Sequence, residues 1–181
     1  MTAFSDPLVA TRAWVESFVV ARDVCPFAGR EVARERIRYL AVPARDREAA
    51  LLALFDACRH LDETSEVETT LLVLSEGLDD FDDYLDLLEV AEALLAEQGY
   101  EGTYQLASFH PDYVFADTQP DDPANFTNRS PFPMWHLLRE ASVERALAYH
   151  PDPAGIPEGN IAAMRALGHP SLFAALARLR G

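Results

Sequence analysis

The first residues that could do chemistry are His110-Pro111-Asp112, which directly follow an apolar stretch at residues 103–109. An imidazole titrates near neutral pH, and a nearby carboxylate can fix its tautomer and orientation. We therefore expect His110 to be a catalytic acid–base group oriented by Asp112, with Tyr113 contacting the substrate. The alternative interpretation is a surface turn stabilised by the proline and the aspartate.

A candidate anion site follows at Asn128-Arg129-Ser130. Ser130 precedes Pro131, and a serine followed by a proline is typical of the start of a helix. Free backbone N–H groups, the helix dipole and the guanidinium of Arg129 would together bind a carboxylate or a phosphate. We expect these residues to bind a small anionic substrate. Alternatively, Ser130 only caps the helix, Asn128 turns the chain and Arg129 pairs with one of the many acidic side chains.

A candidate metal site contains His136 and Glu140, which are four residues apart and therefore on one face of a predicted helix. With His110 and Asp112 they would supply two imidazoles and two carboxylates, a set that suits a divalent Zn, Fe or Mn ion. The spacing lacks the rigid pattern of an HExxH motif, and a helical His–Glu pair is commonly structural. The pair is interpreted either as metal ligands or as a polar wall of the substrate pocket.

Cys25 is a further catalytic candidate, as a nucleophile. It precedes Pro26 at the end of the first predicted helix, so its thiol should lie in irregular backbone, where Arg22 and Arg30 would lower its pKa. A buried, inert thiol is the alternative. Cys58 lies in an Ala/Leu-rich helix and is expected in the core.

The order of the predicted elements indicates how these residues are positioned. Three apolar runs indicate strands, and two stretches with apolar residues at helical spacing separate them. These elements are the strands at residues 36–42, 68–74 and 103–109, and the helices at 46–61 and from 81 to a stop at Gly99. The connections are long enough for parallel crossovers, so we expect an α/β fold with a central β-α-β-α-β unit and a small, mostly parallel sheet.

Further helices and one long loop complete the predicted fold. Asp6 and Pro7 open an N-terminal helix that reaches about Val24. A helix from Ser130 to about Ala148 would carry His136 and Glu140, and two C-terminal helices follow at residues 158–167 and 171–180. Residues 110–130 have no periodic apolar pattern, and long ordered loops of this kind are often functional.

Length and charge limit the partners of the chain. We expect one domain spanning residues 1–181, because 181 residues suffice for one substantial core. The formal net charge of -15 repels nucleic-acid phosphates and anionic membranes, so neither partner is expected. No apolar run approaches the roughly 20 residues that span a bilayer. Residues 1–6 lack the features of a secretory signal, so we expect a cytoplasmic protein.

Four motifs make the chain resemble the bacterial domain-of-unknown-function family DUF1415 over nearly its whole length. The motifs are CPFA at residues 25–28, VETTLLVL at 67–74, ASFHPDYVFA at 107–116 and TNRSPFPMWHLLREAS at 127–142, together with Ile156-Pro157 and Asn160. The resemblance implies that the candidate residues in these motifs belong together in one pocket. It implies no particular reaction.

These observations favour a small-molecule enzyme that acts on an anionic metabolite by His/Asp acid–base chemistry, with or without a metal. In this interpretation Arg129 and Ser130 hold the substrate, and Cys25 is a secondary nucleophile candidate. The alternative is a protein without a reaction, either a ligand-binding module or an interaction module with an acidic surface.

Overall fold

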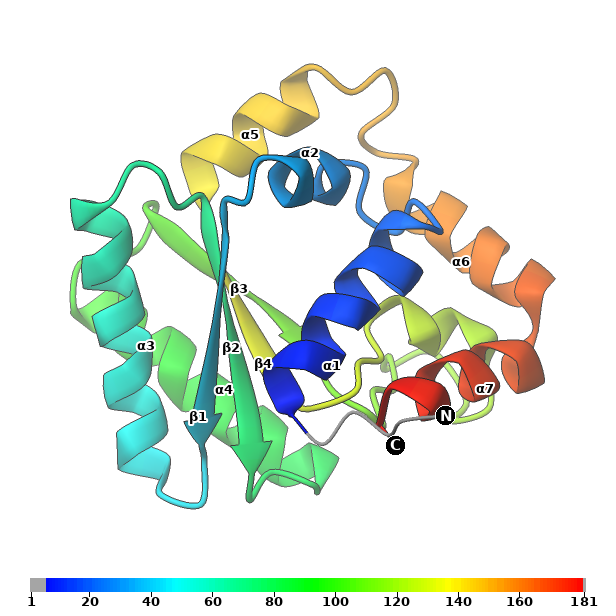
Figure 1. Cartoon of the computed structure of the whole chain (residues 1–181), viewed down its shortest axis with the longest axis horizontal. Coiled ribbons are helices and arrows are strands. Elements are labelled where there is room, and N and C mark those ends of the chain that lie inside the picture. The colour runs from blue at the N-terminus through cyan, green and yellow to red at the C-terminus, as the bar shows by residue number, and fades with distance from the viewer. Residues whose placement is uncertain (1–5, 181) are drawn as a thin grey trace.

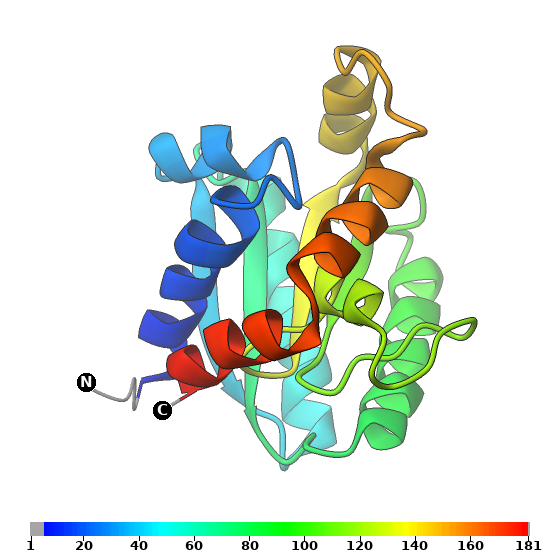
Figure 2. The same cartoon turned by 90° about the vertical axis from the view of Figure 1, so that its right-hand side faces the viewer.

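In the computed structural model of the chain, which describes residues 6–180, a four-stranded sheet lies between two layers of helices (Figures 1 and 2). Helices α3 (Arg47–Glu63) and α4 (Phe81–Glu97) cover one face of the sheet. The other face packs against α1 (Pro7–Trp14), the π-helix η1 (Val15–Val20), the 3-10 helix η2 (Pro123–Thr127), α6 (Ile156–Leu167) and α7 (His169–Arg180). Two short helices, α2 (Ala28–Ala33) and α5 (Glu140–Ala148), lie at one end of the sheet (Figure 1).

Aspartate side chains begin three of the helices by accepting hydrogen bonds from free backbone N–H groups. Asp6 accepts from Leu8 N at 2.8 Å, which confirms its predicted role as a cap. Asp46 caps α3 in the same way, and Asp80 caps α4. Within residues 6–180, the helices are too short or too polar for any of them to cross a bilayer.

The sheet contains one antiparallel strand that the predicted topology lacked. Its strands are β1 (Ile37–Pro43), β2 (Thr69–Glu76), β3 (Tyr104–Phe109) and β4 (Met134–Arg139), in the order β1-β2-β4-β3. β1 and β2 pair in parallel, whereas β4 pairs antiparallel with both β2 and β3. The α/β class is confirmed, but the prediction of a mostly parallel sheet is wrong.

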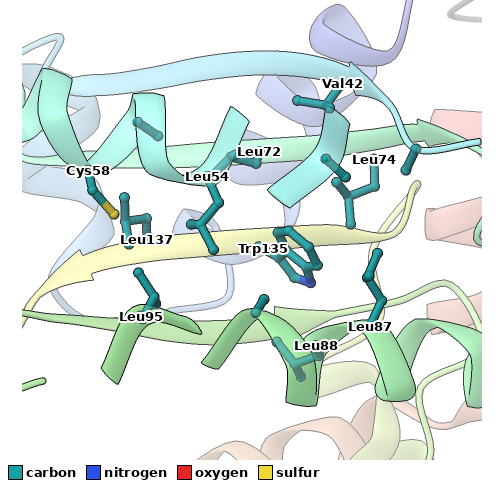
Figure 3. Packing of buried hydrophobic residues seen from close by; sticks show 14 of the residues in the cluster. Val42, Leu54, Cys58, Leu72, Leu74, Leu87, Leu88, Leu95, Trp135 and Leu137 are labelled. Atoms are coloured by element: carbon teal, nitrogen blue, oxygen red, sulfur yellow. The ribbon is translucent and has the colours of Figure 1, made fainter. Parts of the chain in front are cut away.

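The predicted helix from Ser130 to Ala148 is wrong in its first part, where β4 lies, and confirmed in its second part, where α5 lies. Both faces of β4 are covered: Trp135 and Leu137 point toward α3 and α4, and Met134 belongs to the core on the other face (Figure 3). A strand covered on both faces is apolar without alternation, so its pattern is easily taken for a buried helix. The backbone oxygen of Pro133 accepts from Leu74 N at 2.9 Å and so extends the pairing with β2.

The core between the sheet and helices α3 and α4 is formed by apolar side chains from both layers. Leu72 and Leu74 of β2 face Leu54 of α3, and Trp135 of β4 lies against Leu88 of α4 (Figure 3). Cys58 is fully buried in this cluster, as predicted. Close packing therefore fills the space between this face of the sheet and the two helices.

A first prediction concerns Gly77, which turns the chain after β2. Gly77 has φ +86°, and an added Cβ would lie 2.8 Å from Arg45 Cα. Gly99 is a matched control, because it has φ +82° but nothing within 4 Å of an added Cβ. Gly99→Ala should therefore lower the free energy of unfolding by about 1 kcal/mol from backbone strain alone, and Gly77→Ala by more than about 2 kcal/mol because it adds a backbone clash. Urea denaturation measures both, and equal losses would contradict the assigned clash.

Candidate functional site

A cavity of about 810 Å³ lies on the second face of the sheet, over the half from which β1 and β2 start. All four strands contribute to its floor, and its walls come from η1, the turn at Cys25, α2, α5 and Asn160 of α6. None of the residues of α2 or α5 is fully buried, so these helices border the cavity without filling it. Figures 1 and 2 show both helices beyond the end of the sheet, separate from the layer made by α1 and α7.

His136 lies in the middle of the cavity floor, opposite Leu71 of β2 and Ala107 of β3. Its Nε2 atom is buried and has no hydrogen-bond partner among the described residues. Burial lowers the pKa of His136 to about 4, because the low-dielectric surroundings penalise the charged ring. The imidazole is therefore neutral at pH 7 and presents a free polar atom.

Other unpartnered polar atoms also belong to the cavity lining. Among the described residues, nine buried side-chain N or O atoms have no hydrogen-bond partner, and five of them belong to cavity-lining residues. These residues are Trp14, Glu31, Glu68, Thr127 and His136. Buried polar groups in folded proteins are nearly always satisfied by protein, water or ligand. The five atoms are themselves buried, so the cavity lies beside a group of polar atoms that have no hydrogen-bond partner among the described residues.

Cys25 lines the cavity from the turn between η1 and α2, as its predicted place at a helix break implies. The prediction that neighbouring arginines lower its pKa is wrong. Burial raises the pKa of the Cys25 thiol, and the N–H groups of Phe27 and Ala28 offset only part of that rise. Arg22 instead donates to Ser17 O at 2.7 Å. The thiol is therefore protonated at pH 7 and is a polar wall of the cavity.

Two asparagine side chains connect the cavity walls to the backbone. Asn160 Nδ2 donates to Val24 O at 2.8 Å, which ties α6 to the turn that carries Cys25. Asn128 Nδ2 donates to Ser108 O at 3.0 Å and fixes the end of the 110–133 segment against β3. Asn128 was predicted to bind substrate, and it does line the cavity.

His110 and Asp112 lie elsewhere, at the carboxyl end of β3. His110 is fully buried, its Nε2 lies 3.0 Å from Leu78 O, and its Nδ1 accepts from Asp112 N at 3.0 Å. Burial lowers the pKa of His110, and this pattern fits the neutral tautomer with Nε2 protonated. Both nitrogens are engaged by the backbone and the ring does not line the cavity, so the geometry gives His110 a structural position.

The predicted anion-binding residues are also engaged in the 110–133 segment. Arg129 donates to Tyr113 O at 3.1 Å and to Pro120 O at 2.8 Å, and its guanidinium lies over the ring of Phe126. Ser130 Oγ donates to Phe132 O at 2.6 Å, so the prediction that Ser130 caps a helix is wrong. Arg129, Ser130 and Tyr113 stay outside the cavity lining, and their binding roles remain predictions.

The metal site predicted at His136 and Glu140 required both side chains on one face of a helix, and the structure does not have this arrangement. His136 lies in β4 and Glu140 is the first residue of α5, so the two are not on one helical face. Within residues 6–180, no three His, Cys, Asp or Glu side chains gather in a group that could hold a metal ion. Of the predicted site residues, the structure brings together Cys25, Asn128 and His136.

Sequence reasoning missed Trp14, Thr127 and Arg145, which also line the cavity. Thr127 stands inside one of the motifs of the family resemblance, so a signal for it was present. Trp14 and Arg145 carry no local signal. The sequence around a single Trp or Arg on an amphipathic helix is the same whether the side chain faces the core, the solvent or a cavity.

A second prediction tests the structural position of His110. His110→Ala removes a buried ring and leaves Leu78 O without its partner, so it should lower the free energy of unfolding by about 3 kcal/mol. Asp112 is exposed, and Asp112→Ala keeps the backbone N–H that binds His110, so its effect should stay within about 0.5 kcal/mol. Urea denaturation of both variants measures this, and a mild loss for His110→Ala would contradict the assignment.

A third prediction follows from the lowered pKa of His136. In the unfolded chain this histidine titrates near its ordinary value of about 6.5, and in the folded chain at about 4. Between these values the unfolded state binds more protons, so stability is full above pH 6.5 and falls as the pH drops toward 4. NMR titration of the ring checks the folded value directly. The loss of stability over this pH range should be smaller in His136→Gln, and an equal loss would contradict the assignment.

A family described as "Protein of unknown function (DUF1415)" matches residues 7–174 of the 181. The match contains every cavity-lining residue named above. A comparison with curated proteins and a comparison with solved structures each found no match to the chain. Because the match extends from α1 into α7 and covers nearly the whole sequence, the chain belongs to the DUF1415 family.

Proposed function

We propose that this chain is a small-molecule enzyme whose substrate binds in the sheet-face cavity, with His136 as the acid–base group. The observation that carries the proposal is the cavity itself, whose floor includes the imidazole of His136 with a buried Nε2 atom that has no hydrogen-bond partner among the described residues. Active sites commonly combine a concave pocket with a titratable group whose pKa is strongly shifted. His110, expected from the sequence in this role, lies outside the cavity.

The size and lining of the cavity support small-molecule binding. Its volume of about 810 Å³ falls within the roughly 300–1,000 Å³ of typical ligand pockets. Apolar side chains such as Val19, Leu71 and Leu138 alternate with a few polar ones, which is the usual composition of such pockets. The ligand would bury apolar surface against the floor and hydrogen bond to His136.

The chemistry of His136 depends on what binds beside it. In the free protein its pKa of about 4 makes the imidazole a weak base and a neutral hydrogen-bond donor or acceptor. A hydrogen-bond acceptor of the substrate placed at the ring nitrogen would favour the protonated ring and raise the pKa toward neutrality. At that point imidazole transfers protons best at physiological pH.

A ligand-binding protein without a reaction is the second candidate. It is favoured by the raised pKa of Cys25, which keeps the thiol protonated and poorly nucleophilic at pH 7. Both candidates place the ligand in the same cavity, and they differ in whether the bound molecule changes chemically.

Our fourth prediction tests the cavity with Nile red, a neutral apolar dye that fluoresces when removed from water. Ala146 of α5 lines the cavity, whereas Ala148 on the same helix is exposed and outside the lining. Ala146→Trp should place an indole in part of the space that the dye occupies and weaken dye binding by at least about tenfold. Ala148→Trp should bind the dye like the wild type. Equal binding by all three proteins, or no binding by the wild type, would contradict the proposal.

A further inference from the structure

The side chains that line the cavity carry a net charge opposite in sign to that of the whole chain. Four arginines and two glutamates line it, which is a formal excess of two positive charges in a protein of net charge -15. The arginines are Arg30, Arg36, Arg139 and Arg145, and the glutamates are Glu31 and Glu68. A local excess of positive charge beside low-dielectric walls favours a negatively charged ligand.

Two of the four arginines are paired with the two glutamates. Arg36 contacts Glu68 at 2.8 Å and Glu31 at 3.6 Å. Arg30 is largely exposed and lies 3.5 Å from the carboxylate of Glu31. These four residues form a nearly neutral group at one side of the cavity, so the positive excess comes from the other two arginines.

Arg139 and Arg145 have no carboxylate within 4 Å among the described residues. Arg139 uses its Nη2 on the backbone oxygens of Leu61, Thr64 and Val67, at 2.6–3.2 Å. Arg145 makes one hydrogen bond, to Ser142 Oγ at 2.8 Å, on its own helix. Of these two arginines without a carboxylate, Arg145 therefore has more unused donors, and a guanidinium fork matches a carboxylate with two parallel hydrogen bonds.

Apart from His136, the floor away from these arginines is apolar. Ile37, Leu71 and Leu138 come from three adjacent strands, and Val15 and Val19 of η1 also line the cavity. Phe109 lies edge-on to Trp14, with ring centroids 5.3 Å apart, and both rings line the same cavity. Trp14, Val15, Val19 and Leu71 are buried in one core cluster, whereas Ile37, Phe109 and Leu138 are only partly buried. The partly buried side chains are the ones that the apolar part of a ligand could cover.

Resting on the proposed function, we infer that the ligand is an amphipathic carboxylate, with its carboxylate at Arg145 on α5 and its apolar body on the sheet floor. The positive excess favours a negatively charged ligand, the apolar floor favours an apolar body, and the guanidinium of Arg145 can bind one carboxylate through two parallel hydrogen bonds. In this proposal Arg145 takes the anion-binding role that the sequence had suggested for Arg129, which does not line the cavity.

The test measures how well four compounds displace Nile red at low salt. The compounds are decanoate, butyrate, decanol and decyl phosphate, which vary the head group and the apolar length separately. Decanoate should displace the dye best, because only decanoate combines the carboxylate with a long apolar body. Arg145→Gln should weaken decanoate by about tenfold, the effect of losing a charge-assisted hydrogen bond, and leave Nile red and decanol unchanged.

Arg178→Gln is the matched control, because Arg178 is exposed on α7, bonds only to Ala174 O of its own helix and does not line the cavity. It should bind every compound like the wild type. If decanol or decyl phosphate competes better than decanoate, or Arg145→Gln leaves decanoate unchanged, the carboxylate assignment is wrong while the cavity remains a binding site. If Nile red itself does not bind, the proposed function fails with it.

Discussion

The antiparallel pairing of β4 between β2 and β3 is the constraint on which the rest of the structure depends. The chain leaves β3 at the carboxyl end of the sheet and must turn back before β4 can enter between two strands that share a direction. The return makes the sheet continuous and buries Trp135 and Leu137 against α3 and α4. It also presents the alternate side chain, His136, on the opposite face.

The 110–133 segment connects β3 to β4, and hydrogen bonds from its own side chains hold it in one conformation. Asn125 is fully buried, accepts from Phe115 N and Thr118 Oγ1, and donates to Gln119 O. His110 and Arg129 bond to backbone groups of the same region. Buried side chains whose polar atoms are satisfied, as those of Asn125 are, favour one conformation of a segment that has no periodic apolar pattern. The polar residues that suggested a catalytic loop therefore have a structural explanation in the pairing of β4.

The second face of the sheet is only partly filled by helices, and this leaves the cavity. One half packs against α1, η2, α6 and α7, whereas the other half is bordered by α2 and α5, which have no fully buried residue. The charge is also uneven, since four arginines and two glutamates line the cavity while the protein as a whole is strongly acidic.

Local signals were enough to predict most of the helices and strands. Asp6 and Pro7 mark a helix start, and the apolar run at residues 68–74 marks a buried strand, because these signals depend on neighbouring residues. The sequence also identified Cys25, Asn128 and His136, which line the cavity. Only the tertiary structure decided that residues 134–139 form a strand, that His110 is enclosed and that Arg145 reaches the cavity. Each of these depends on which strand pairs with which, and pairing joins residues far apart in the chain, where a local pattern carries no information.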